Sequence, residues 1–160
     1  MKQDIIQSLT SFLTDVSIHY QKKDNIIHFP FYIEGKINEG ATFIHVSEES
    51  YIVETGLPIE VHPEAFDLLT EFFIKINEKS EYGYFQLNEE THLISYIIKV
   101  NVHNTSLPRK VIEHSLLLPI EIYGAYGFAN AIYYLLSNIL TVDEALDFVV
   151  ESKVYEKLDE

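Results

Sequence analysis

The chain has 160 residues, with 25 acidic side chains against 11 lysines and arginines and a formal net charge of −14 at pH 7. Nucleic acids and anionic membrane surfaces bind clusters of basic side chains, so we expect neither as a partner. The absence of cysteine excludes disulfides, thiol nucleophiles, iron–sulfur clusters and cysteine-ligated zinc. The length predicts one domain over residues 1–160, and 47% hydrophobic residues suffice for a core.

No apolar block typical of a secretory signal follows Met1. The longest apolar stretch, Ala129 to Leu140, is interrupted by polar residues and is too short to cross a bilayer. Together with the lack of cysteine, these features predict a cytoplasmic protein. The ratio of ten lysines to one arginine is typical of an AT-rich bacterial genome.

The first third of the chain predicts a helix followed by four antiparallel strands. Apolar residues recur at helical spacing between about Lys2 and Asp15. From Val16 the period changes to two, which is typical of strands that bury one face. Polar turns are expected near residues 22–25, 38–39 and 47–50. The predicted core face of this meander consists of Ile18, Phe29, Phe31, Ile33, Ile44 and Val53.

Each turn predicts a strand register that keeps the apolar residues on one face. The predicted pairs are Val16 with Phe31, Ile18 with Phe29 and Tyr20 with Ile27 in the first hairpin, Ile33 with Ile44 and Phe31 with Val46 in the second, and Val46 with Tyr51 and Ile44 with Val53 in the third. The first hairpin also places His19 opposite His28. Pro30 has no N–H to donate, so we expect it where its strand lacks a partner on one side.

The middle of the chain predicts a second helix and a second hairpin. Pro63 suits the first turn of that helix. Two strands follow, Tyr82 to Leu87 and His92 to Val102. Their apolar residues fall on both faces, with Tyr84, Leu93 and Ile97 on one face and Phe85, Ile94, Tyr96 and Ile98 on the other. Such strands need cover on both sides, by helices or by a second subunit.

The last third predicts helices. A mostly apolar helical region runs from Pro108 to about Leu140, and Pro119 should kink or split it. Thr141 and Glu144 have the spacing of a capping box that begins a short helix. The predicted fold class is therefore α+β, an antiparallel sheet meander packed against helices in the order α-ββββ-α-ββ-α-α.

This order resembles that of the bacterial YbjN-like family. Two segments add to the resemblance, EYGYFQL at residues 81–87 and LTVDEAL at residues 140–146. The resemblance implies a fold like that of the class I type III secretion chaperones and a regulatory or chaperone-like role. It implies no catalytic residue.

We find no catalytic, cofactor or metal site in the sequence. The six glycines form no phosphate-binding loop. The acidic pairs Glu48-Glu49 and Glu89-Glu90 lie in predicted turns, where solvated carboxylates are common. His19 and His28 could share a metal across a hairpin, but no third ligand is identifiable, and metal sites normally have three or four.

Two functions remain open. The first is a non-catalytic protein-binding, chaperone-like or regulatory module, expected to be a homodimer. Its candidate binding or dimer surface consists of Tyr84, Leu93, Ile97, Tyr123, Tyr126 and Tyr133. The second is an acidic immunity- or inhibitor-type protein that neutralises a basic enzyme. The alternative to the dimer is a monomer. In that monomer the helix that begins at Thr141 folds back over the strand with two apolar faces.

Overall fold

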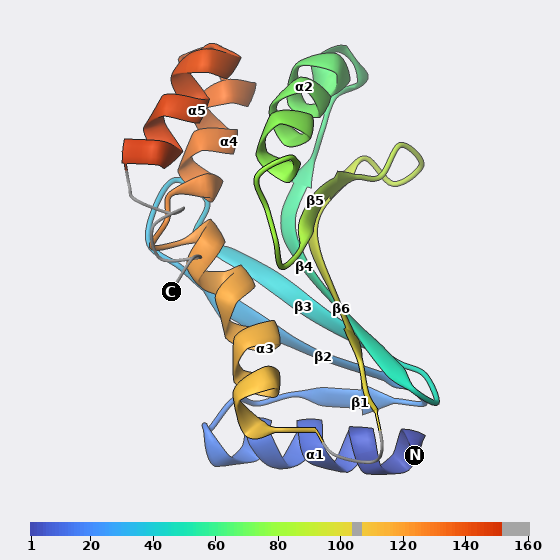
Figure 1. Cartoon of the computed structure of the whole chain (residues 1–160). Coiled ribbons are helices and arrows are strands. Elements are labelled where there is room, and N and C mark those ends of the chain that lie inside the picture. The colour runs from blue at the N-terminus through green and yellow to red at the C-terminus, as the bar shows by residue number, and fades with distance from the viewer. Residues whose placement is uncertain (104–106, 152–160) are drawn as a thin grey trace.

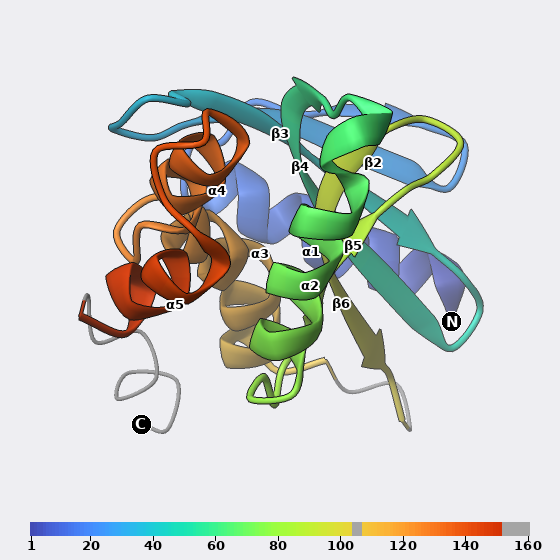
Figure 2. The ribbon, with the colours of Figure 1, turned by 90° about the horizontal axis from the view of Figure 1, so that it is seen from above.

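Helices lie on one side of a six-stranded antiparallel sheet (Figures 1 and 2) in this computed structural model, which describes residues 1–103 and 107–151. The strand order is β1-β2-β3-β4-β6-β5. The elements are α1 (Lys2–Asp15), β1 (Gln21–Lys23), β2 (Ile26–Tyr32), β3 (Glu39–Val46), β4 (Ser50–Glu60), a short 3-10 helix (Pro63–Ala65), α2 (Phe66–Asn77), β5 (Tyr84–Leu87), β6 (Leu93–Asn101), α3 (Arg109–Tyr123), α4 (Phe128–Leu136) and α5 (Val142–Glu151). The α+β class is confirmed, with one more helix than expected because the long helical region is divided.

The register of β3 and β4 is confirmed. Ile44 lies opposite Val53 and Val46 lies opposite Tyr51. The turn between these strands is short, and the Ser47 N–H donates to the Ser50 carbonyl over 2.8 Å. A short turn leaves little freedom in the pairing that follows it.

The predicted first strand is wrong. Residues 16–20 are not a strand, β1 is only Gln21–Lys23, and Gln21 lies opposite His28 where His19 was expected. The physical reason lies at the end of α1, where Ser17 adopts a positive φ of 61° and the Ile18 N–H donates to the Leu13 carbonyl over 2.8 Å. Residues 16–18, which the alternating pattern predicts as part of a strand, instead form the turn that ends the helix.

The register of β2 and β3 was also wrong. Ile44 lies opposite Ile27 instead of Ile33, and Phe31 lies opposite Gly40. The connection is a longer loop than expected, closed by a 2.9 Å hydrogen bond from the Ile33 N–H to the Asn38 carbonyl. Pro30 lies where expected, because β1 pairs only with residues 26–28 and leaves that side of β2 free.

The core lies between the sheet and the helices. Of the six residues predicted for the core face, Phe29, Phe31, Ile44 and Val53 are at most 5% exposed. Ile18 and Ile33 are only partly buried and pack at its margin. The opposite face of the sheet, which we call the outer face, has no helix over it among the described elements (Figure 2).

The long helical region is split, but not at Pro119. Helix α3 continues through Pro119 to Tyr123, and the chain breaks at residues 124–127. Gly127 there has a φ of 80°, a left-handed conformation that suits glycine and ends regular helix. The predicted site of the break was therefore wrong by several residues.

The capping box at the start of α5 is confirmed. The Glu144 N–H donates to the Thr141 hydroxyl and the Thr141 N–H donates to the Glu144 carboxylate, both over 3.2 Å. Helix α5 packs against α2 and α4, on the side of the sheet that carries the other helices and away from the outer face (Figures 1 and 2). The account in which this helix covers the two-faced strand is wrong. Within the described ranges, no helix is long and apolar enough to cross a membrane.

Candidate functional site

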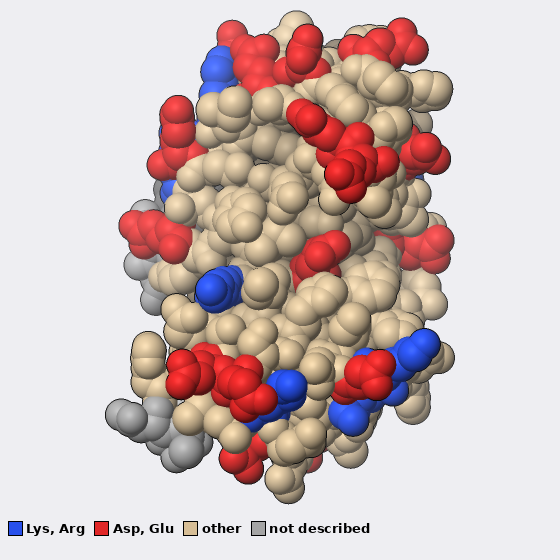
Figure 3. All heavy atoms as spheres, turned by 90° about the vertical axis from the view of Figure 1, so that its right-hand side faces the viewer, with Lys and Arg blue, Asp and Glu red and all other residues tan. Residues whose placement is uncertain are grey.

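Three of the six predicted surface residues lie together on the outer face. Tyr84 on β5 is opposite Ile97 on β6, and Leu93 lies further along β6 on the same face. Tyr84 and Leu93 are 48% and 43% exposed, whereas Ile97 is 8% exposed between its neighbours. Viewed from the side of β5 and β6, uncharged surface covers much of the middle of the molecule, and acidic side chains lie toward both ends (Figure 3).

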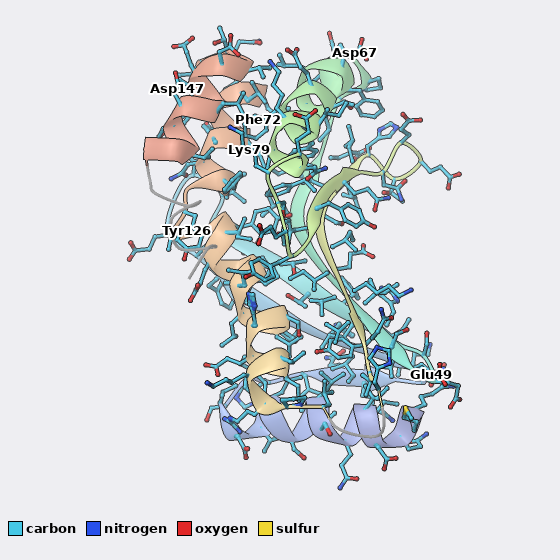
Figure 4. The ribbon with its side chains drawn as sticks, in the orientation of Figure 1. Glu49, Asp67, Phe72, Lys79, Tyr126 and Asp147 are labelled. Atoms are coloured by element: carbon cyan, nitrogen blue, oxygen red, sulfur yellow. The ribbon has the colours of Figure 1, made fainter. Side chains whose placement is uncertain are left out.

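Tyr123 and Tyr126 are not surface residues, so their assignment to the binding surface was wrong. Tyr123 is 1% exposed and donates from its hydroxyl to the Thr55 carbonyl over 2.9 Å. Tyr126 is 6% exposed at the junction of α3 and α4 (Figure 4). Both are buried because this junction packs onto the inner face of the sheet. Tyr133 on α4 is 37% exposed, but it lines a separate hollow with Ile37 and Pro58.

A groove of about 810 Å³ lies between the C-terminal half of β6 and the N-terminal half of α3. Ile98 and Val100 line it on the strand side, and Val111 and Leu118 line it on the helix side. Tyr82 closes one end, where its ring meets the ring of His114 edge-on at 4.6 Å. This volume is within the roughly 300–1,000 Å³ that binding clefts usually have.

The strand side of this groove has an unpaired edge. β5 pairs with β6 only over residues 94–97, so Ile98–Asn101 have no strand on that side within the part of the chain that the structure describes. The Val102 N–H donates to the Glu49 carbonyl, on the β4 side. Because antiparallel strands alternate the direction of their backbone groups, those of Lys99 and Asn101 are directed away from β4 and toward the groove.

The polar side chains of the groove have structural partners or face solvent. The Tyr51 hydroxyl lies 2.8 Å from the Ser115 hydroxyl, which donates to the Ile112 carbonyl over 3.0 Å. Burial raises the pKa of Tyr51 to about 12, and the hydrogen bond to Ser115 partly offsets that rise. Ser115 is thus held by Tyr51 and by its own helix, and among the described residues no hydrogen bond joins it to a base that would make it a nucleophile.

The other residues considered for catalysis or metal binding do not lie together at one site. His28 faces Gln21 and stacks on Phe43 at 5.4 Å. Glu49 lies at the tip of the β3–β4 turn (Figure 4), and its neighbour Glu48 pairs with Lys2 over 3.5 Å. Across residues 1–103 and 107–151, no group of three histidines, aspartates or glutamates could hold a metal ion.

No family model and no curated protein sequence matches the chain. A solved structure does match it, the crystal structure of YbjN from E. coli, described as a candidate transcription regulator. The two chains share 12% sequence identity with a TM-score of 0.50, over 94% of this chain and 93% of that chain. The chain has the YbjN-like fold. The resemblance predicted from the element order is confirmed at the level of fold, and an identity of 12% extends it no further.

The groove of this YbjN-like fold was not among the features predicted from the sequence. The signal was present in the predicted lengths, since a strand from Tyr82 to Leu87 is too short to pair with all of His92 to Val102. The unpaired remainder of β6 follows directly from that difference. The position of α3 beside it depends on long-range packing, which strand and helix periods do not specify.

Proposed function

We propose that this chain is a non-catalytic, cytoplasmic protein-binding module with a regulatory or chaperone-like role, and that it holds a segment of a partner protein in the groove between β6 and α3. The observation that carries this proposal is the unpaired edge of β6 beside exposed apolar side chains. Val111 and Tyr82 at the groove are 37% and 42% exposed. A row of free backbone N–H and C=O groups matches another polypeptide backbone, and the apolar walls match its side chains.

The polar side chains of the groove already contact neighbouring side chains, and this supports a binding role over a catalytic one. His114 contacts Tyr82, and Ser115 is hydrogen-bonded to Tyr51 and to its own helix. A catalytic site needs a nucleophile within reach of a base, with donors placed for the developing charge. The described part of the groove offers a strand edge and apolar contacts in their place.

Selection from a random peptide display library tests the proposal. We expect peptides selected on the wild-type protein to lose about tenfold or more in affinity for Val111→Asp, because a charge would replace an apolar wall. Tyr133→Asp is the matched control, since Tyr133 is equally exposed but lies on α4 outside the groove. The selected peptides should bind Tyr133→Asp as tightly as they bind the wild-type protein.

Peptides that bind Val111→Asp as tightly as the wild type would contradict the proposal. If those peptides are basic, the result would favour the immunity- or inhibitor-type function, which uses the acidic surface.

A further inference from the structure

We infer that the segment bound in the groove is an extended strand with alternating apolar and acidic side chains, which occupies the place of a longer β5 beside Lys99 and Asn101. This inference rests on the proposed function and adds the conformation and charge of the bound segment. Four observations support it: the path of the chain before β5, the direction of the free backbone groups, the apolar inner side, and two lysines that form no ion pair with the described residues.

The chain reaches the strand position beside β6 only at Gly83, one residue before β5 begins. A Cβ at Gly83 would lie 2.5 Å from the Ile97 carbonyl oxygen, so the backbone there is in close contact with β6. Immediately before it, Tyr82 reaches His114 on α3. The polypeptide thus crosses from α3 to β6 at one end of the groove, and the strand position beyond Ile97 is left to another segment.

The free edge matches a strand of about four residues. Lys99 and Asn101 each direct one N–H and one carbonyl toward the groove, and no hydrogen bond joins these groups to another segment among residues 1–103 and 107–151. Residues rise about 3.3 Å each along a strand, so a segment of four residues spans the edge from Ile98 to Asn101. It can form up to about four backbone hydrogen bonds, as each free residue exchanges two.

The two faces of the added strand meet different surroundings. Side chains alternate from one face to the other along a strand. Those on the inner side would lie against Ile98, Val100 and Val111, which are apolar. Those on the outer side would lie beside Lys99. The bound segment should therefore alternate apolar and acidic residues.

The basic residues of the groove select for acidic ones. Lys99 and Lys110 both line the groove, and neither forms an ion pair among the described residues. A lysine on a strand edge opposes pairing with a neutral or basic strand, and it favours a strand that brings a carboxylate. Glu81 lines the end of the groove near Tyr82, so the acidic residues are expected beside Lys99 and away from Glu81, and Lys110 adds a second positive charge to the groove.

The net charge of −14 does not override this local selection. At 0.15 M salt, charges more than about 8 Å apart are largely screened. The acidic residues elsewhere on the molecule then contribute little, whereas a carboxylate in contact with Lys99 keeps most of its attraction.

Two synthetic peptides test the inference at 0.15 M salt by calorimetry. Both have seven residues and blocked ends, with valine at every second position; one carries glutamate at the other positions and one carries lysine. We expect the glutamate peptide to bind the wild-type protein at least tenfold more tightly. The double variant Lys99→Glu with Lys110→Glu should reverse this preference. Lys23→Glu changes one charge on β1, at the far edge of the sheet, and should leave the preference intact.

A backbone-methylated glutamate peptide tests strand addition separately. It keeps every side chain but loses alternate N–H donors, so its affinity should fall about tenfold or more. Equal binding of the methylated and unmodified peptides would overturn strand addition. Equal binding of the glutamate and lysine peptides, both lost in Val111→Asp, would overturn the charge selection while retaining the proposed function. If neither synthetic peptide binds while display-selected peptides do, the inference fails and the proposed function stands.

Discussion

Two buried threonine hydroxyls lie next to each other in the sheet. Thr42 and Thr55 are directly opposite on β3 and β4, both are 0% exposed, and neither hydroxyl has a hydrogen-bond partner among the described residues. Burying an unpartnered hydroxyl costs roughly 1–3 kcal/mol. Thr42→Val keeps the shape without the hydroxyl, so it should raise the free energy of unfolding by about 1 kcal/mol in urea titrations.

Thr42→Ala is the control for this substitution. It also removes a buried methyl group, so the free energy of unfolding should fall. A loss of stability in Thr42→Val as large as that in Thr42→Ala would show that the hydroxyl is hydrogen-bonded in solution.

Tyr51 predicts how stability depends on alkaline pH. Burial raises its pKa in the folded protein to about 12 from a model value of 10.0. Between these two values the unfolded chain releases the phenol proton while the folded protein retains it, so stability should fall as the pH rises through this window. The contribution of Tyr51 to that fall is roughly 3 kcal/mol in total, at ~1.36 kcal/mol per pH unit.

Tyr51→Phe should make the pH dependence shallower by one proton between pH 10 and 12, as measured by denaturant titrations at several pH values. The dependence should not vanish, because burial also raises the pKa of Tyr96 and of Tyr123. The slope with pH is the relevant quantity, since the loss of the Ser115 hydrogen bond lowers stability equally at every pH in this window. An unchanged slope would contradict the prediction.

At the scale of elements, periodicity predicted faces better than registers. His28 pairs two residues away from its expected partner His19, and Phe31 pairs six residues away from Val46. Both errors are even numbers of residues, and an even shift returns each side chain to the same face. The core residues Phe29, Phe31 and Ile44 were therefore predicted correctly although two registers were wrong.

The exposure of the candidate surface residues was predicted in part, for a related reason. Tyr84 and Leu93 were assigned to a face by strand alternation, and both are exposed there. Tyr123 and Tyr126 lie where a helix ends and the chain turns, so their direction depends on how α3 and α4 dock onto the sheet. Helical period alone does not specify that docking, and both side chains are buried by it.

The capping box of α5 gives a prediction at the same scale. Thr141→Ala removes the hydroxyl that accepts from the Glu144 N–H, which should lower the free energy of unfolding by about 1 kcal/mol. Thr141→Ser keeps the hydroxyl and serves as the control, with a change within about 0.5 kcal/mol. If both variants are destabilised equally in urea titrations, the methyl group and not the cap is the source of the effect.

At the scale of the whole molecule, the outer face motivates the prediction of a homodimer. Tyr84 and Leu93 on β5 and β6, and Phe43 and Ile26 on β3 and β2, are each 38–48% exposed on it. A two-fold dimer would bury the same patch of both copies. Light scattering at micromolar concentration should give twice the chain mass of 18.6 kDa. A mass near that of one chain would contradict the dimer.

The salt dependence of the dimer and one substitution test the dimer prediction further. Two copies with a formal charge of −14 each repel one another, so raising the salt from about 0.02 to 0.3 M should strengthen the dimer by screening. Leu93→Glu should split it, because an unpaired charge would be buried at the interface. Tyr133→Glu, exposed on α4 away from the outer face, should leave the mass unchanged. A dimer that weakens with salt would contradict an apolar interface.

The central position of β4 in the sheet has a consequence for synthesis on the ribosome. β4 lies between β3, which precedes it directly, and β6, whose last residue is made 41 residues after the end of β4 at Glu60. At about 5–20 residues per second, that interval lasts roughly 2–8 s. During it the nascent chain carries an 11-residue strand with one unpaired edge, whereas in the finished protein β4 has a strand on both sides. The growing chain is therefore exposed to aggregation at a strand edge that is covered once translation ends.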